Sequence, residues 1–200
     1  MIHIERTKTA LEYEKALEYL KPVLADINRR LSRESERDVI DSVTSRVKTS
    51  ASIEKKLKKK GYKPTLENAE EHLNDIAGMR AVCLYIDDLY RIRKALVKER
   101  SIRIVKEKDF IDRPKKSGYR SLHLILEVPI CYERGEKMVR VELQLRTMIM
   151  HLWARIDHRN CYKKDAKQGD AVSKTLRLCA KLGDRLDEEM MHARRQMFVE

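Results

Sequence analysis

The sequence contains few aromatic residues: its 200 residues include one Trp, two Phe and eight Tyr. So few rings argue against a broad surface on which the bases of single-stranded nucleic acid could stack. The chain also has no apolar run near the length of a membrane span, and its N-terminus lacks the apolar segment of a secretory signal. We therefore expect a cytoplasmic protein that does not enter a membrane.

Cysteine is scarce as well, and the four cysteines are dispersed without a Cys-x-x-Cys pair. A chain of this length can bury a core without a disulfide framework, so we expect reduced thiols. Charge, in contrast, is abundant: charged residues make up 38% of the sequence, and the formal net charge is +12. This excess favours partners that carry negative charge, namely nucleotides, nucleic acid or an anionic membrane surface.

The hydrophobic pattern predicts an α+β fold. Apolar residues between Thr9 and Leu31 recur with a helical period, and Pro22 is expected to break or kink this helix. Further helices are predicted over Ser35–Val47, Ser50–Lys60, Leu66–Leu73, Asp87–Glu99, Thr147–Tyr162 and Ala171–Met197. Strands are predicted over Met79–Ile86, Ile102–Lys106, Arg120–Val128 and Met138–Leu145, the last two joined by a turn at Glu133–Lys137. We expect a mixed, mostly antiparallel sheet of about five strands, flanked by helices and extended by helices at both termini.

The stretch between Asp109 and His123 is the richest in functional residue types. Pro114 cannot continue a helix and Gly118 allows backbone conformations closed to other residues, so Lys115–Tyr119 is predicted to be a shaped loop. A tyrosine and several cations on one loop suit a purine nucleotide, because the ring can stack on the base while the cations meet phosphates. The alternative is a basic surface hairpin.

Residues 139–146 alternate strictly between apolar and polar side chains. The apolar row is predicted to face the core, and the polar row, which faces the other way, consists of Arg140, Glu142, Gln144 and Arg146. Such a row is either a solvated face or the floor of a site. Its mixture of an amide, a carboxylate and two arginines is typical of a site.

Two other segments carry candidate phosphate and metal chemistry. Asp75, at the end of a predicted helix, can bind magnesium, which prefers hard oxygen ligands and shares them with phosphates. Glu142 could share that metal or take a proton from an attacking hydroxyl; alternatively, Asp75 only caps a helix or turn. The predicted helix over residues 50–60 has one face that carries Ser52, Lys56 and Lys59 or Lys60. This basic face either binds a triphosphate or is simply exposed to solvent.

These motifs stand in a fixed order. They are Arg46-Val-Lys48 with Ser52 and Lys56, Asp75-Ile-Ala-Gly-x-Arg80, Gly118-Tyr119-Arg120-Ser121-x-His123, and Val141-Glu142-x-Gln144-x-Arg146-Thr147 with Trp153-Ala154. Together they resemble the synthetase domain of the RelA/SpoT proteins, most closely the small, stand-alone alarmone synthetases, over about residues 40–165. The resemblance implies a nucleotidyltransferase-like fold. It also implies transfer of the β,γ-pyrophosphate of ATP to the 3′-hydroxyl of GDP or GTP, giving ppGpp or pppGpp, the alarmones of the stringent response.

The resemblance further implies a role for each motif residue. The adenine of ATP would lie between Arg46 and Arg80, and its phosphates would bind Lys48, Ser52, Lys56 and Lys59. Asp75 would hold magnesium, and Glu142 would help to bind the metal and would activate the 3′-hydroxyl. Tyr119 would stack on guanine, and the rest of the acceptor would meet Lys108, Lys115, His123 and Gln144. The hydrolase domain of bifunctional relatives has no counterpart here, so we expect no alarmone degradation.

One departure keeps other functions open. Where close relatives of the family usually read Met-Asp-Phe-Trp-Ala, this chain reads Met150-His151-Leu152-Trp153-Ala154. A histidine in place of an acid beside the acceptor pocket, with the high net charge, leaves a second possibility: a toxic family member that pyrophosphorylates the 3′ end of tRNA. A third, a non-catalytic nucleic-acid-binding module, explains the charge but not Asp75 and Glu142.

We expect the chain to have three parts. Residues 1–40 would be an N-terminal helical extension, residues 41–165 the pyrophosphokinase domain, and residues 166–200 a C-terminal helix. That helix carries an apolar stripe over more than six turns, which is long for packing on its own domain. The resemblance implies a homo-oligomer, commonly a tetramer, built through the terminal helices.

Overall fold

The computed structural model describes residues 8–132, 135–161 and 166–197. Its helices are α1 (Lys8–Ser35), α2 (Ser50–Lys59), α3 (Leu66–His72), α4 (Ile86–Lys98), α5 (Met148–Cys161) and α6 (Ala166–Met197). Its strands are β1 (Ile40–Val47), β2 (Ala77–Cys83), β3 (Arg103–Asp109), β4 (Leu122–Tyr132) and β5 (Gly135–Thr147). No helix in these ranges has the length and apolarity needed to cross a membrane.

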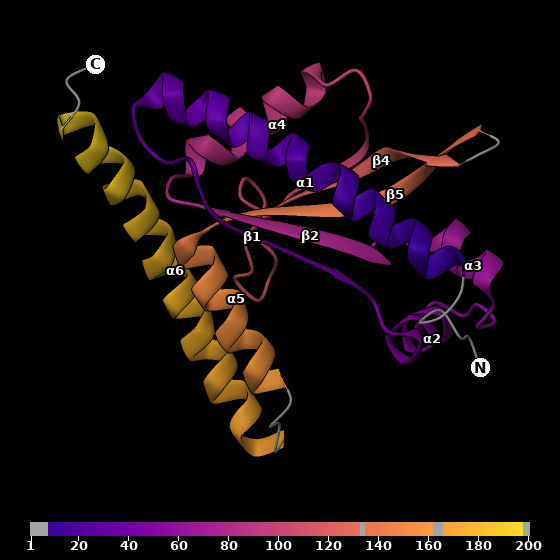
Figure 1. Ribbon diagram of the computed structural model, residues 1–200. Helices are drawn as coiled ribbons and strands as arrows, with labels where there is room; N and C mark the ends of the chain where they lie inside the picture. The colour runs from indigo at the N-terminus through magenta and orange to yellow at the C-terminus, as the bar shows by residue number, and fades with distance from the viewer. Residues whose placement is uncertain (1–7, 133–134, 162–165, 198–200) are drawn as a thin grey trace.

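The five strands form one mixed sheet, in the order β1-β2-β5-β4-β3 (Figure 1). β2 and β5 run parallel, and the other three neighbouring pairs are antiparallel. This arrangement confirms the predicted α+β class with a mostly antiparallel sheet. It also places β2 beside β5, so the segment that follows Asp75 lies against the strand that carries Glu142.

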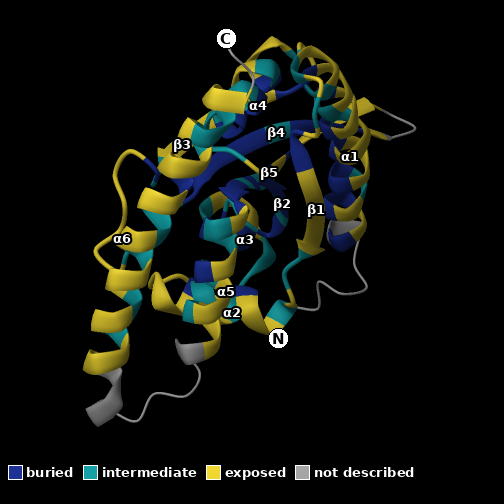
Figure 2. Cartoon of the chain, turned by 90° about the vertical axis from the view of Figure 1, so that its left-hand side faces the viewer, coloured by how far each residue is buried: buried dark blue, intermediate teal, exposed yellow. Residues whose placement is uncertain are grey.

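Helices α1 and α4 cover one face of the sheet and form the core with it (Figures 1 and 2). The predicted stripe of α1 is buried at every described position, namely Tyr13, Ala16, Leu17, Leu20, Leu24, Ile27 and Leu31. Of the predicted break or kink at Pro22, the break is wrong, because α1 continues through this residue. Pro22 is exposed, and the buried Leu20 and Leu24 hold the helix against the sheet on both sides of it.

The predicted helix over Ser35–Val47 is also wrong. α1 ends at Ser35, Glu36 takes a left-handed conformation with φ 53°, and Ile40–Val47 forms an edge strand paired with β2. Six consecutive residues of β1 are exposed, so its sequence shows no alternation between buried and solvated positions. Pairing with β2 provides hydrogen-bond partners for the backbone of β1, and the β-branched residues of β1 prefer a strand conformation. These two effects outweigh the weak helical pattern of the segment.

The other predicted elements agree with the structure to within a few residues at their ends. Glu133, in the predicted turn, and Tyr162, at the end of a predicted helix, lie outside the described residues. α5 and α6 pack side by side on one side of the molecule, and α2 and α3 lie on the opposite side (Figure 1).

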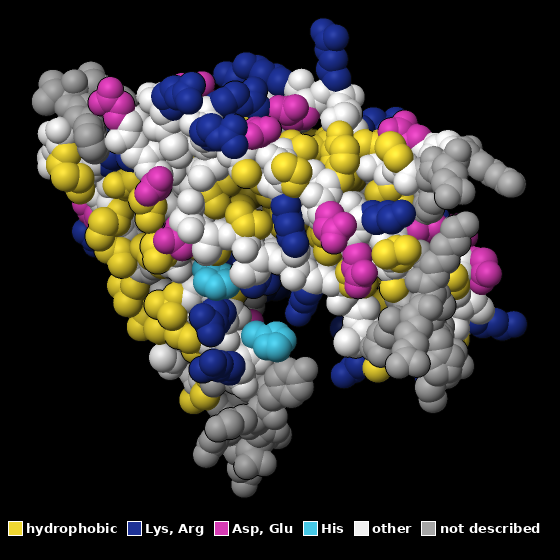
Figure 3. Space-filling model, in the orientation of Figure 1, with side chains coloured by type: hydrophobic (Ala, Val, Ile, Leu, Met, Phe, Trp, Pro, Cys, Tyr) yellow, Lys and Arg dark blue, Asp and Glu magenta, His cyan; other side chains and the backbone are white. Residues whose placement is uncertain are grey.

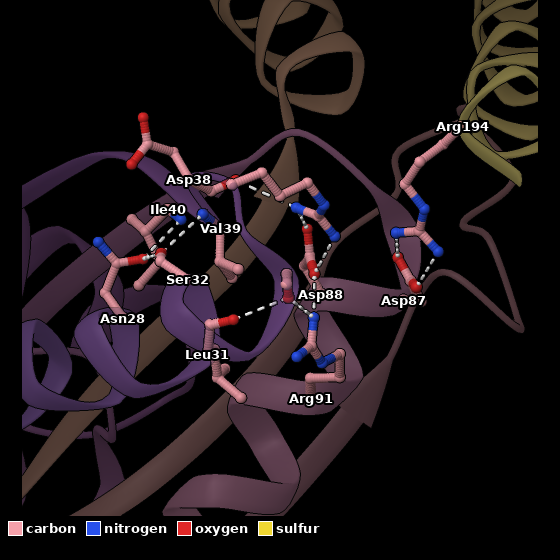
Figure 4. A network of polar contacts seen from close by, with 12 residues as sticks. Asn28, Leu31, Ser32, Asp38, Val39, Ile40, Asp87, Asp88, Arg91 and Arg194 are labelled. Atoms are coloured by element: carbon pink, nitrogen blue, oxygen red, sulfur yellow. Dashed lines mark hydrogen bonds and ion pairs between the residues drawn. The ribbon is translucent and has the colours of Figure 1, made fainter. Parts of the chain in front are cut away.

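An ion-pair network ties α6 to α4 (Figure 4). Arg194 of α6 donates two hydrogen bonds to Asp87, at 3.0 and 2.7 Å, and Arg37 donates two to the buried Asp88 beside it. Both guanidinium groups lie over the ring of Tyr85, with the guanidinium carbons of Arg194 and Arg37 at 4.8 and 4.7 Å from its centroid. The C-terminal part of α6 is therefore fixed to the start of α4.

Candidate active site

Two residues of the polar row of β5, Glu142 and Gln144, form the floor of a cavity of about 180 Å³. Because side chains alternate along a strand, the buried Val141, Leu143 and Leu145 face the core, while Glu142 and Gln144 face the opposite side of the sheet. The cavity is lined by Thr44, Ser45, Arg46, Lys48, Asp75, Ile76, Gly78, Met79, Arg80, Glu142 and Gln144. Of the two interpretations of this row, the structure supports a site floor.

Asp75 lies at the centre of one side of this cavity. We call this the donor side, because the resemblance implies that it binds ATP, the donor of the pyrophosphate. Its Oδ2 atom accepts hydrogen bonds from the ammonium groups of Lys48, on the segment after β1, and Lys56 of α2. Burial alone would raise the pKa of Asp75, but the hydrogen bonds and charges of the two lysines outweigh it and hold that pKa below its usual value. Asp75 is therefore ionised at neutral pH, and it is more than a helix cap.

Glu142 is held by two neighbours. Gln144 Nε2 donates to its Oε2 at 2.7 Å, and His123 Nδ1 lies 3.1 Å from its Oε1. Burial would raise the pKa of Glu142, but the contacts with His123 and Gln144 outweigh it and hold the pKa below its usual value. Glu142 is thus a fixed, ionised carboxylate at the centre of the floor.

The acceptor loop, which we define as residues 110–121 between β3 and β4, brings Tyr119 to the other side of Glu142. The Tyr119 hydroxyl lies 2.7 Å from His123 Nε2, so Tyr119, His123 and Glu142 form one continuous chain of polar contacts. Lys115 Nζ lies 4.6 Å from the centroid of the Tyr119 ring and 4.6 Å from that of Phe110. The predicted loop therefore exists, with its ring and its cation beside the floor.

Two residues of this site, Arg146 and Phe110, were given no individual role in the sequence-based prediction. Arg146 is buried and donates to the Tyr119 hydroxyl at 2.6 Å and to Gln144 Oε1 at 2.9 Å. It belongs to the same polar row as Glu142, and that row was the available signal. Phe110 meets the rings of Tyr119 and His123 edge-on, at 5.9 and 5.3 Å between centroids, and nothing local in the sequence indicates this.

Three predicted residues lie apart from this cluster. Ser52 is exposed and shares a hydrogen bond with Thr49, the residue that caps α2. Lys59 is exposed near the end of α2, and Lys108 is exposed on β3 opposite His123. None of the three lines the cavity as the described residues form it. Arg46, Arg80 and Gln144, in contrast, all line it, and Gln144 Oε1 accepts from Arg80 Nη2 at 3.2 Å.

The two carboxylates fit a divalent cation. Asp75 Oδ1 is buried and has no hydrogen-bond partner within the described ranges, so this oxygen is available as a ligand. Asp75 and Glu142 line the same cavity. Magnesium is typically bound by one or two carboxylates together with the phosphates of a substrate, which is the donor set that this cavity offers.

Comparison with known proteins places the chain in a family. Residues 45–167 match the family described as "Region found in RelA / SpoT proteins". The chain is 34% identical over 203 residues to the GTP pyrophosphokinase YwaC of Bacillus subtilis, covering 98% of this chain and 97% of that one. It is 37% identical over 182 residues to the GTP pyrophosphokinase YjbM of the same organism, covering 91% and 85%.

Solved structures agree with this assignment. The crystal structure of small alarmone synthetase 1 from Bacillus subtilis, bound to its product pppGpp, matches with a TM-score of 0.83 at 36% identity. The match covers 94% of this chain and 95% of that chain. The family match spans more than half of the sequence and contains every residue of the cavity floor, and so the chain belongs to the RelA/SpoT family.

Proposed function

We propose that this protein transfers the β,γ-pyrophosphate of ATP to the 3′-hydroxyl of GDP or GTP. One observation carries the proposal: Asp75 with its two lysines, and Glu142 with Tyr119 and His123, approach the same floor from opposite sides. The first group suits a metal-bound polyphosphate, and the second suits a base and a ribose hydroxyl. Phosphoryl-type transfer depends on positioning and charge, which this arrangement supplies.

On the donor side, the cations of the cavity bind ATP. Lys48 and Lys56 meet its phosphates, with Ser52 and Lys59 further along α2, and Arg46 and Arg80 hold the adenine. Asp75 and Glu142 hold Mg²⁺ through their carboxylate oxygens. When bound, the ion neutralises charge on the transferred pyrophosphate and orients it. Attack at the β-phosphorus breaks its bond to the α-phosphate oxygen, so AMP leaves.

On the acceptor side, Glu142 accepts the proton of the 3′-hydroxyl as the new oxygen–phosphorus bond forms. Its low pKa keeps it ionised before the reaction. Tyr119 stacks on the guanine once the Lys115 ammonium above its ring turns to a phosphate. Lys108, Lys115 and His123 surround the phosphates of the acceptor, and Gln144 keeps the Glu142 carboxylate in place.

The test is a transfer assay with ATP labelled in its γ-phosphate, Mg²⁺ and separate acceptors. We expect label in a 3′-pyrophosphorylated guanine nucleotide when GDP or GTP is offered, and none when EDTA is added. Label only in tRNA would replace this proposal with the alternative acceptor. Binding of nucleic acid without any transfer would leave a non-catalytic binding module.

The tRNA alternative rests on His151. Its imidazole is half-buried on α5, and burial together with the charges of Arg80, Arg146 and Arg155 lowers its pKa. The imidazole therefore favours its neutral form, and no carboxylate at this position offsets the charges of the three arginines near it. This excess of positive charge favours the phosphate backbone of a nucleic acid, so the assay must include tRNA as an acceptor.

We also propose that the chain forms a homo-oligomer, with a tetramer favoured, through α5 and α6. The predicted stripe of α6 is largely solvent-exposed, and exposed apolar side chains include Leu152, Ile156, Val172, Leu182, Leu186, Met190 and Met197. They gather on one flank of the molecule (Figure 3). Large exposed apolar patches mark association surfaces. Light scattering should give a multiple of the 23.6 kDa chain mass, and Leu182→Glu should reduce it.

The proposed division of the chain follows from these roles. Every proposed active-site residue falls within residues 41–165, the proposed synthetase domain. Residues 1–40 supply α1, which packs on the far face of the sheet, and residues 166–200 supply α6, the proposed oligomerisation helix.

A further inference from the structure

We propose that α6 positions the acceptor loop, so that this helix controls acceptor binding without contributing a side chain to the active-site cavity. Arg120 and Asp184 are the positioning residues of this contact. The inference rests on the proposed reaction, because it concerns the loop that carries Tyr119 and Lys115. It adds a structural element and two residues to that reaction.

The first observation is an ion pair between the loop and the helix. Arg120, the last charged residue of the acceptor loop, pairs with Asp184 of α6. Its Nη2 also donates to the carbonyl oxygen of Ile111 at 3.2 Å, so one guanidinium joins both ends of the loop to α6. The Arg120 side chain is 12% exposed and that of Asp184 is 39% exposed, so the guanidinium is shielded from solvent while the carboxylate lies at the surface.

The second observation is backbone contact at Gly118. Its φ of +96° lies in the region that favours glycine, and a Cβ atom added there would lie 2.5 Å from Ala180 Cβ of α6. The loop backbone therefore rests directly on the helix. Gly118 N donates to the Lys115 carbonyl oxygen at 2.8 Å, and Lys115 N donates to that of Tyr119 at 3.2 Å. The position of Gly118 on α6 thus sets the positions of Lys115 and Tyr119.

The third observation concerns Trp153, the only tryptophan of the chain. Its indole Nε1 donates to the carbonyl oxygen of Leu176 in α6 at 2.7 Å. The Tyr119 ring packs edge-on against the same indole, with 6.5 Å between centroids. The ring proposed to stack on guanine is therefore supported by a side chain that α6 holds in place.

The donor side has no comparable support from this helix. None of the described residues of α6 lines the cavity that holds Lys48, Asp75 and Arg80. A change in the position of α6 should therefore alter acceptor binding and leave ATP binding unchanged. The affinity for GDP and the affinity for an ATP analogue can each be measured in a separate titration.

The experiment compares three variants with wild type. Asp184→Ala removes the ion pair, and Asp184→Glu keeps the charge. Gly183→Ala adds a Cβ atom 2.8 Å from Ile149 Cγ2 of α5, so the contact between α5 and α6 must shift. For Asp184→Ala and Gly183→Ala we expect the GDP Kd and acceptor KM to rise about tenfold, with less than about a twofold change for a non-hydrolysable ATP analogue. Asp184→Glu should lie nearer to wild type.

A matched control removes a different anchor of the same helix. Arg194→Gln breaks the pair with Asp87 (Figure 4), which lies near the C-terminal end of α6 and includes no residue of the acceptor loop. We expect its binding constants to stay at the wild-type values. Tryptophan emission of Trp153 should change in Asp184→Ala and Gly183→Ala but not in Arg194→Gln, which gives a readout independent of turnover.

Two results would overturn the inference. One is GDP binding at the wild-type level in both Asp184→Ala and Gly183→Ala. The other is equal weakening of GDP and the ATP analogue together with a lower Tm, which would mean that Asp184 only stabilises the fold. A wild-type protein that fails to bind GDP would instead remove the proposed function itself, and this outcome is visible before any variant is made.

Discussion

The two sides of the active-site floor are built differently. On the donor side, Lys48 and Lys56 both point their ammonium groups at one carboxylate, Asp75, and β1 behind them is an exposed edge strand. On the acceptor side, Tyr119 and His123 belong to a hydrogen-bonded and aromatic cluster supported by α6. The donor side is thus held by charged side chains that hydrogen-bond to one carboxylate, whereas the acceptor side is held by aromatic packing together with hydrogen bonds.

This difference indicates how each substrate is recognised. Ammonium groups on flexible stems can leave Asp75 and follow the phosphates of a nucleotide. A packed aromatic cluster must already have the right shape, because rearranging it would cost buried contacts. We therefore expect selection of the acceptor to depend on preorganisation and binding of the donor to depend on charge. The following predictions test this comparison.

Glu142→Gln acts on both sides, and we expect the largest effect from it. The substitution is nearly isosteric and leaves the core row of β5 intact, so the fold and nucleotide binding should persist. Loss of the general base should reduce kcat by about two to four orders of magnitude. Single-turnover assays measure the rate, and calorimetry with both nucleotides verifies binding. A variant with wild-type kcat would make Glu142 a structural residue.

Asp187→Asn tests the packing of α6 against the acceptor side. Asp187 is buried and accepts from Thr147 Oγ1 at 2.9 Å, and burial raises its pKa to about 6 despite that bond and the charge of Arg120. The folded state thus binds this proton more tightly than the unfolded chain does. The stability contributed by the proton is complete below about pH 4 and is lost as the pH rises through about 6.

The free energy of unfolding of wild type should accordingly fall relative to Asp187→Asn by up to about 3 kcal/mol between pH 4 and pH 7. Urea unfolding of both proteins across this range measures the difference, in which the titration of other carboxylates cancels. Parallel stability curves would show that Asp187 keeps an ordinary pKa.

Tyr119→Ala removes the ring of the acceptor side. Base–aromatic stacking is worth about 1–3 kcal/mol, so we expect GDP affinity to fall about 5- to 150-fold and affinity for an ATP analogue to change little. Separate titrations decide the matter. Equal loss of both affinities would mean that Tyr119 shapes the whole floor, because its hydroxyl also meets His123 and Arg146.

Lys56→Ala, on the donor side, should have the smallest effect. Its side chain is more than one-third exposed, and Lys48 still contacts Asp75. We expect the affinity for an ATP analogue to fall about fivefold, equivalent to about 1 kcal/mol, with GDP affinity unchanged. Raising the salt concentration should weaken ATP binding to wild type more than GDP binding. Equal salt dependence would contradict the contrast between the two sides.

Several parts of this molecule could be predicted from the sequence because their signals are local. The helical spacing of apolar residues in α1 and the apolar–polar alternation of β5 arise because each element has one buried face. Both patterns correctly predict which residues are buried. β1 could not be predicted in this way, since an edge strand with exposed residues has no buried row. The contact of Gly118 with Ala180 joins residues far apart in the chain, and no local pattern reports it.

The shared carboxylate of the donor side has a consequence for selectivity. Asp75 already has two counter-ions, Lys48 and Lys56, whose positive charges repel a free divalent ion that approaches the open Oδ1 atom. A metal that arrives with a triphosphate brings its own anions, to which the two lysines can transfer. The site therefore exchanges one set of charge partners for another, and it distinguishes a metal–nucleotide complex from the bare cation without a dedicated cage.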